Sequence, residues 1–183
     1  GRHPTLPDIP SVDMDNLAGA KLVITHLLAK DRTRIGTITG SPDMMVTRDR
    51  LDGYKRSLEE MDLTVNPDLI VAGNFTQEGG YQAMMDLIEH NVDAVFCQSD
   101  TMAVGALQAI QDAGMSVPGD VSVVGFDDAP FAPNIDPPLT TVRQPTDQLA
   151  TRSVDMLTCL VDGRPLEETS EHLFAELIVR KSS

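Results

Sequence analysis

The feature that most constrains the fold of this chain is a regular alternation of short, β-branched apolar runs with longer segments of helical periodicity. Strands are expected at residues 34–39, 69–72, 93–97, 121–126, 140–143 and 174–180. Helices are expected where apolar side chains recur every three or four positions, at residues 15–30, 48–61, 77–89, 101–113 and 147–161. This alternation predicts an α/β fold in which a parallel sheet carries helices on both faces. Residues 127–138 interrupt it with four prolines, which exclude a helix and favour a rigid connection.

The charge and composition of the chain limit its partners. Its 183 residues are 41% hydrophobic, which is enough for a core, and carry a formal net charge of −14. Such an acidic chain repels phosphate backbones, so these residues by themselves should bind neither DNA nor an anionic membrane. No apolar run approaches the roughly 20 residues that span a bilayer. Cys97 and Cys159 fall in an expected strand and an expected helix, which favours two buried, reduced thiols over a disulfide.

The candidate binding residues follow from a rule for open α/β sheets, whose ligands bind beyond the carboxyl ends of the strands. The residues just beyond these ends are 40–47, 74–75, 98–100 and 127–128, with Arg48 and Arg50 nearby. They combine carboxylates, amides, hydroxyls, guanidinium groups and one aromatic ring. Such a mixture suits a neutral ligand with many hydroxyls, because charged groups can bracket the hydroxyls while the ring stacks on an apolar face.

Several of these residues also have plainer interpretations. Asp100 directly precedes an expected helix and is at least as suited to capping it as to binding a ligand. Asp128 fits a solvated loop, and Phe75 fits an ordinary core position. Arg48 and Arg50 are expected in the first turn of a helix, where one of them could pair with a surface carboxylate. For Arg50 we favour ligand contact.

The motifs of common enzyme classes are absent from the sequence. It contains no GxGxxG dinucleotide fingerprint, no GxxxxGK[ST] phosphate loop and no GxSxG nucleophile motif. The four histidines are scattered and the two cysteines are far apart, so neither set has the spacing of metal ligands. We therefore expect no catalytic residue, no cofactor and no metal site.

Several segments, in the right order and at the right intervals, resemble the signature of LacI–GalR transcription regulators. These are VDMDNLAGA (12–20), RDRLDGY (48–54), DAVFCQSDTMAVGALQAIQDAG (93–114), VPGDVSVVGFDDAP (117–130) and PPLTTVRQP (137–145). The last two together are highly specific, and the resemblance covers essentially the whole chain.

The resemblance implies a periplasmic-binding-protein-like core, in which two α/β subdomains enclose an effector. Residues 14–142 and 174–183 would form a nearly complete C-terminal subdomain. Residues 1–13 and 143–173 would be a remnant of the N-terminal subdomain, and the DNA-binding head would be missing. Because the units that normally cover residues 147–161 would be missing too, apolar side chains should lie bare there. The chain would then associate through this surface or leave the remnant poorly ordered.

The resemblance also assigns roles to five residues. Arg50 matches an arginine that grips effector hydroxyls or carboxylates, and Asp127 matches an acidic residue that accepts hydrogen bonds from the effector. Phe75 matches an aromatic or apolar wall, and Gln144 a polar contact from a segment that crosses between subdomains. Ser99 occupies a place often held by asparagine in sugar binders. From these roles, Arg50→Ala and Asp127→Ala are expected to abolish effector binding and barely change the melting temperature.

The implied function is that of the ligand-sensing core of a cytoplasmic, homodimeric regulator. A small effector would favour a closed arrangement of the subdomains and so change operator affinity through the absent head. Met44 and Val46 stand where purine-sensing relatives place polar or basic residues, which favours a carbohydrate effector. One alternative is a secreted or lipid-anchored sugar-binding protein of a transporter, which has the same fold; LTTVRQP and LIVRKSS are more typical of regulators. An unrecognised α/β enzyme is the other alternative.

Overall fold

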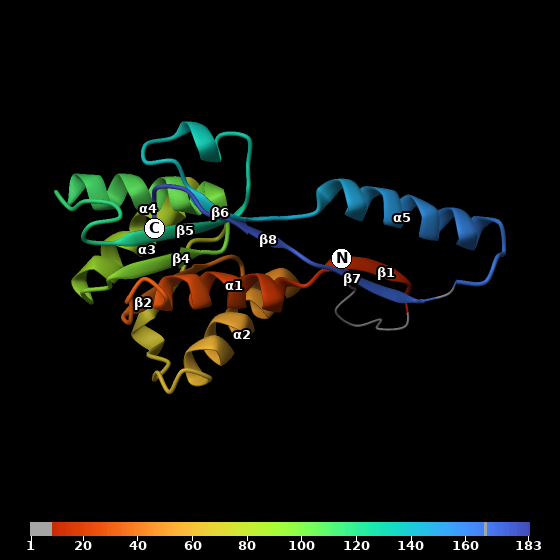
Figure 1. The fold of residues 1–183 in the computed structure, drawn as a ribbon, viewed down its shortest axis with the longest axis horizontal. Helices are drawn as coiled ribbons and strands as arrows, with labels where there is room; N and C mark the ends of the chain where they lie inside the picture. Colours follow the sequence, from red (N-terminus) through yellow and green to blue (C-terminus); the bar gives the residue numbers. More distant parts are fainter. Residues whose placement is uncertain (1–8, 167) are drawn as a thin grey trace.

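The larger of two sheets forms the body of the molecule. The computed structural model describes residues 9–166 and 168–183 (Figure 1). The strands of the large sheet run in the order β3-β2-β4-β5-β6-β8, and only β8 is antiparallel to its neighbour. Their bounds are β2 (Ile35–Thr39), β3 (Ile70–Ala72), β4 (Ala94–Cys97), β5 (Ser122–Asp127), β6 (Thr140–Arg143) and β8 (Glu176–Ile178).

Helices cover both faces of this sheet. One face carries α1 (Asn16–Leu28) and α2 (Met45–Glu59), and the other carries α3 (Gln77–Glu89) and α4 (Asp100–Asp112) (Figure 1). The apolar stripe of each helix packs on side chains from the central strands, so the sheet is buried on both sides. The prediction of a parallel sheet between two helical layers is confirmed.

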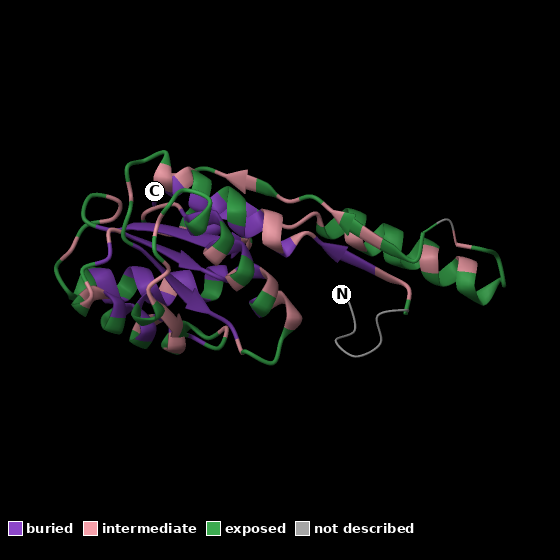
Figure 2. Cartoon of the chain, turned by 90° about the horizontal axis from the view of Figure 1, so that it is seen from below, coloured by how far each residue is buried: buried purple, intermediate pink, exposed green. Residues whose placement is uncertain are grey.

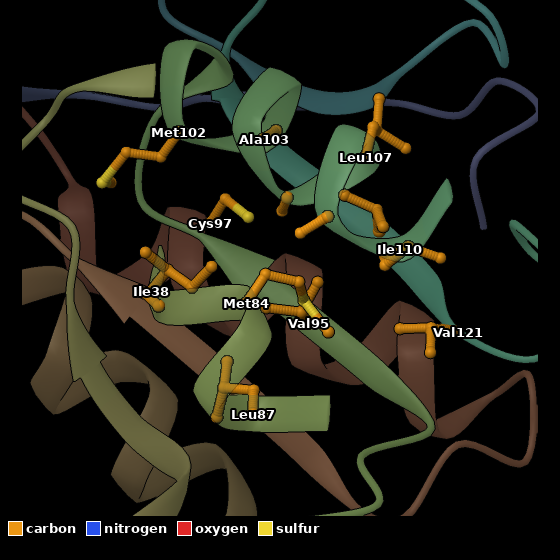
Figure 3. Close-up of a cluster of buried hydrophobic side chains, with 14 of the residues drawn as sticks. Ile38, Met84, Leu87, Val95, Cys97, Met102, Ala103, Leu107, Ile110 and Val121 are labelled. Carbon is orange, nitrogen blue, oxygen red and sulfur yellow. The ribbon is translucent and has the colours of Figure 1, made fainter. Parts of the chain in front are cut away.

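The core beneath α3 and α4 is aliphatic and sulfur-rich, because the chain has few aromatic residues (Figure 3). Ile38 and Val95 from the sheet pack against Met84, Met102 and Ile110 from the helices, and all five side chains are fully buried. The opposite face holds the aromatic residues Tyr54, Phe96 and Phe126, packed among α1, α2 and the central strands. Both layers are therefore tightly constrained by side-chain packing.

Glycines bring the α3 and α4 backbones into direct contact. A Cβ at Gly80 would lie 2.2 Å from the carbonyl oxygen of Met102, and a Cβ at Gly105 would lie 2.0 Å from that of Gln77. These separations are far below any van der Waals contact. The two helices can therefore pack at this distance only because both positions lack a side chain.

A small second lobe projects from the body (Figures 1 and 2). It contains the parallel pair β1 (Ser11–Met14) and β7 (Ser170–Leu173), with α5 (Thr146–Val161) packed beside β1. The described part of the chain passes between the lobes three times, at residues 14–16, 143–146 and 173–176.

The small lobe leaves much apolar surface uncovered. No residue of α5 is buried, as the green and pink helix of Figure 2 shows. Its exposed apolar side chains, between 47% and 78% accessible, are Val154, Leu157, Leu160 and Val161. The expectation that apolar side chains lie bare on this helix is confirmed. Residues 1–8 of the expected remnant lie outside the described residues.

The structure corrects several expected element boundaries. The second helix begins at Met45, three residues earlier than expected, because residues 45–47 contain neither proline nor glycine to stop it; Arg50 thus lies in its second turn. Within the expected strand 174–180, only residues 176–178 form a strand, which is β8; β7 ends at Leu173, before this range, and neither β1 nor β7 was expected. Residues 127–138 hold no α-helix but one short 3₁₀ turn, Ala132–Asn134, and another 3₁₀ turn spans Pro67–Leu69.

None of the described helices has the length and apolarity needed to cross a membrane.

Candidate functional site

Arg50 is the centre of a buried polar cluster at the carboxyl ends of the strands. Helix α2 places its side chain inward, where only 4% of it is exposed. Its Nε donates to Oδ1 of Asn16 at 2.8 Å, and its Nη1 donates to the carbonyl oxygen of Gln98 at 2.6 Å. The guanidinium carbon lies 3.7 Å from the ring centroid of Phe126. Burial lowers the pKa of Arg50 to about 10, although Asp127 and other carboxylates attract its charge, so it remains a cation at neutral pH.

Asp127 faces Arg50 from the end of β5. Burial raises the pKa of its carboxyl group, while the charge of Arg50 and hydrogen bonds from Gln144 and the backbone of Asp100 act in the opposite direction. Nε2 of Gln144 donates to Oδ1 of Asp127 at 2.6 Å. Since Gln144 lies on a segment that crosses to the small lobe, this bond links the carboxylate of the large lobe directly to an inter-lobe connection.

Asp100 joins three elements around Asp127. Its carboxylate is fully buried and accepts hydrogen bonds from the hydroxyl of Thr141 at 2.5 Å and from the backbone N–H of Ala129 at 2.7 Å. The cap of α4 is Ser99, whose hydroxyl accepts from the N–H of Met102, so the capping role considered for Asp100 belongs to its neighbour. Asp100 instead fixes the loop after β5 to α4 and β6.

The burial of Asp100 leads to a pH prediction. Loss of solvation raises its pKa to about 6, with hydrogen bonds from Thr141 and Ala129 acting in the opposite direction. The folded state then binds the proton more tightly than the unfolded state, so this group's contribution to stability falls as pH rises from about 4 to about 6 and is constant above that. Between about pH 4.5 and about pH 7, the free energy of unfolding of the wild type relative to Asp100→Asn should fall by about 2 kcal/mol. Urea unfolding at both pH values measures this difference, and an equal difference at the two would contradict it.

Asp128 is not the solvated loop residue that the sequence suggested. Its Oδ2 accepts from Nε of Arg143 at 2.7 Å, and its Oδ1 accepts from Nη2 of Arg180 at 2.6 Å. Burial would raise the pKa of this carboxyl group, but the two arginines more than compensate and lower it. Asp128 therefore ties the end of β6 to the C-terminal segment, close to two of the inter-lobe crossings.

Arg48, which the sequence placed near the strand ends, donates from Nε to the carbonyl oxygen of Pro42, so this bond is to backbone and not to a carboxylate.

The remaining expected site residues, Phe75 and Ser99, lie on the same edge of the sheet. The ring of Phe75 rests against Gly40, where an added Cβ would lie 2.0 Å from the ring. Phe75 is half-buried and also packs against the aliphatic core, so both of its proposed roles, wall and core, are compatible with its position. Ser99 uses its hydroxyl as a helix cap.

A cavity of about 230 Å³ lies where the two lobes meet. It is lined by Met14, Asp15, Asn16, Leu17, Asp49 and His172. Asn16 is the side chain that binds Arg50, and His172 comes from β7 of the small lobe. The hollow between the lobes thus adjoins the polar cluster. Among the described residues, no group of histidine, cysteine or acidic side chains is arranged to hold a metal ion.

Sequence reasoning missed two residues of this cluster, Asn16 and Phe126. Both are set by long-range packing: Asn16 lies at the first inter-lobe crossing, and Phe126 faces α1 from β5. The motif GFDD contains Phe126 beside Asp127, and the alternation of side chains along a strand would have placed it on the opposite face of the sheet from Gly125. Cys97 is buried as expected, whereas Cys159 is only half-buried, and both thiols are free.

Comparison with known proteins places these features in a family. A family model for the periplasmic binding protein-like domain matches residues 24–183. The HTH-type transcriptional regulator GalR of Escherichia coli (strain K12) is 37% identical over 174 residues, which are 94% of this chain and 50% of GalR. The chain therefore spans about half the length of the curated relatives it matches.

Solved structures give the same assignment. A transcriptional regulator CelR–cellobiose complex superimposes with a TM-score of 0.96 at 35% identity, over 100% of this chain and 57% of that one. The lac repressor dimer bound to operator and an anti-inducer gives a TM-score of 0.90 at 30% identity, over 97% and 62%. These relatives are transcription regulators, as the resemblance read from the sequence implied. The chain belongs to the periplasmic binding protein-like domain family, in the form that serves as the effector-binding core of LacI–GalR transcription regulators.

Proposed function

We propose that this chain binds a small carbohydrate effector between its two lobes and that binding changes the operator affinity of a cytoplasmic, homodimeric regulator. The observation that carries the proposal is the cluster of Arg50, Asp127 and Gln144 at the edge of the sheet where the lobes meet. A guanidinium group, a carboxylate and an amide provide donors and acceptors for sugar hydroxyls. The CelR relative was solved with cellobiose, which supports a sugar as the effector class.

The proposed mechanism uses the bond between Asp127 and Gln144. A sugar hydroxyl that donates to Asp127 competes with Nε2 of Gln144 for the same carboxylate. Gln144 lies on the segment entering α5, so the exchange of partners changes the preferred position of the small lobe. A ligand shifts such an equilibrium only by its difference in affinity for the two arrangements. The relay to DNA would pass through a DNA-binding head and a dimer of the kind seen in the lac repressor–operator complex.

The division into subdomains is also part of the proposal. Residues 14–142 and 174–183 would form the C-terminal subdomain, and residues 1–13 and 143–173 part of the N-terminal one. The separation of β1, β7 and α5 from the six-stranded sheet supports these boundaries.

A thermal-shift experiment tests the proposed function. The purified protein is heated with cellobiose, glucose, galactose, glucose 6-phosphate or adenosine, each in excess. A ligand at 100 times its Kd stabilises the folded state by about 2.7 kcal/mol, so at least one sugar should raise the melting temperature by several degrees. Asp127→Asn should abolish the shift, and Asp86→Asn, an exposed position on α3, should preserve it. No shift with any sugar, or an unchanged shift in Asp127→Asn, would overturn the proposal.

A further inference from the structure

One buried hydroxyl in the described part of the chain has no hydrogen-bond partner, and it lies beside the proposed effector site. It is Oγ1 of Thr47, a residue that is only 3% exposed. Every other buried side-chain nitrogen or oxygen within residues 9–166 and 168–183 is satisfied. A buried polar group without a partner destabilises the folded state, so its presence calls for an explanation.

The surroundings of this hydroxyl all belong to the carboxyl edge of the sheet. A Cβ at Gly40, the residue that follows β2, would lie 2.6 Å from Oγ1 of Thr47 and 2.0 Å from the ring of Phe75. The hydroxyl is thus enclosed between the end of β2 and that ring. The backbone of Thr47 lies near Gln98, whose Nε2 approaches its carbonyl oxygen at 3.4 Å. Arg50 follows one helical turn later on α2.

The Phe75 ring that covers this hydroxyl is carried by a segment with an uncommon backbone conformation. Asn74 and Phe75 have φ angles of 54° and 59°, a left-handed conformation that is uncommon for a bulky residue such as phenylalanine. Strain of this kind persists where the surrounding structure requires it, often beside a ligand site. The half-buried ring of Phe75 is therefore the side chain that lies over Thr47 at this edge of the sheet.

The start of α2 also differs from the starts of its neighbours. Helices α1, α3 and α4 begin with a side chain that accepts a backbone N–H, from Asp15, Thr76 and Ser99. The corresponding residue of α2, Met44, supplies no such acceptor. The first turn of α2 therefore offers the donor end of a helix, together with an unpaired hydroxyl, on the side of the protein that bears Arg50.

We propose that Thr47 is an effector-binding residue and that its hydroxyl hydrogen-bonds an oxygen of the effector at the uncapped start of α2. The inference rests on the proposed function and deepens it, because it adds a subsite for an oxygen of the ligand. That oxygen belongs to a sugar hydroxyl or to the phosphate of a sugar phosphate. In the empty protein, the ring of Phe75 covers this subsite.

Matched threonine variants test the inference. Thr47→Val removes an unpaired hydroxyl, so the empty protein should melt at the same temperature as the wild type or higher. Thr37→Val is the control: Thr37 is equally buried on β2, but its hydroxyl donates to the carbonyl oxygen of Phe96 at 3.0 Å, so its loss should lower the melting temperature. Thr47→Ser keeps the hydroxyl and should retain binding.

Calorimetric titration with cellobiose, glucose, galactose and glucose 6-phosphate supplies the second readout. For whichever sugar binds the wild type, Thr47→Val should weaken affinity about tenfold or more, as expected for one lost hydrogen bond. Binding of glucose 6-phosphate but not glucose would identify the oxygen as that of a phosphate, and the converse as that of a hydroxyl. Equal affinity in Thr47→Val and the wild type, or a fall in melting temperature as large as that of Thr37→Val, would overturn the inference alone. If the wild type binds no sugar, the proposed function fails and the inference fails with it.

Discussion

Arg50→Ala is expected to lower the free energy of unfolding by about 3–5 kcal/mol and to abolish effector binding at the same time. The substitution removes the cation that faces the buried carboxylate of Asp127 and leaves that charge without its main partner. It also removes the bonds to Asn16 and Gln98 and the stacking on Phe126. Each of these interactions is shielded from solvent, so little is recovered from water.

Urea unfolding at neutral pH measures this loss, and Arg48→Ala is its matched control. Arg48 lies on the same helix but is exposed and makes one bond to a backbone carbonyl, so its removal should cost less than about 1 kcal/mol. If Arg50→Ala were as stable as Arg48→Ala, the buried cluster would contribute nothing to the fold. This expectation replaces the one drawn from sequence, that Arg50→Ala would barely change the melting temperature, because the structure places the residue inside the protein.

Gly105→Val is expected to have a comparable effect on stability, about 3 kcal/mol or more, without involving the effector site. The new side chain would collide with the carbonyl oxygen of Gln77 and the amide nitrogen of Tyr81, and neither can move without displacing α3. Overpacking in a core usually costs about 1–3 kcal/mol, and contact with backbone atoms puts this case at the upper end. The aliphatic core beneath both helices would be opened as they separate.

The control for Gly105→Val is Gln108→Val, which adds the same residue to the exposed side of α4. It should change the free energy of unfolding by about 0.5 kcal/mol or less. Both variants are measured by urea unfolding and by the melting temperature. A Gly105→Val protein as stable as Gln108→Val would show that α3 and α4 tolerate a wider separation than their backbone contact implies.

The repeated strand–helix pattern was sufficient to predict the large sheet, since strands such as residues 121–126 are continuous apolar runs of the kind buried on both faces. The edge that carries the site also followed, because the carboxyl ends of parallel strands meet there whatever the family. The small lobe was harder. The sequence SEHL of β7 carries no apolar alternation, and β7 is a strand because it pairs with β1, more than 150 residues earlier in the chain.

The contacts within the site could not be predicted for a related reason. Arg50 was identified by its place near the strand ends and by resemblance, but its partners Asn16 and Gln98 come from other segments and depend on how α1 and β4 are packed. Asp128 looked like a surface residue because the two arginines that bind it, Arg143 and Arg180, lie far along the chain. The local sequence predicts which residues form helices and strands, whereas these hydrogen bonds form only once the whole sheet has assembled.

The three crossings between the lobes have a mechanical consequence. Two lobes joined by a single segment can rotate freely about it. Three neighbouring crossings resist twisting and sliding of the lobes, so bending at the crossings is the motion of lowest energy. Arg143, at the second crossing, pairs with Asp128 of the large lobe and with Glu176 at the third crossing, so these charges stiffen the joint further. We therefore expect the small lobe to rotate about one axis, so that a small displacement near the joint becomes a large one at the far end of α5.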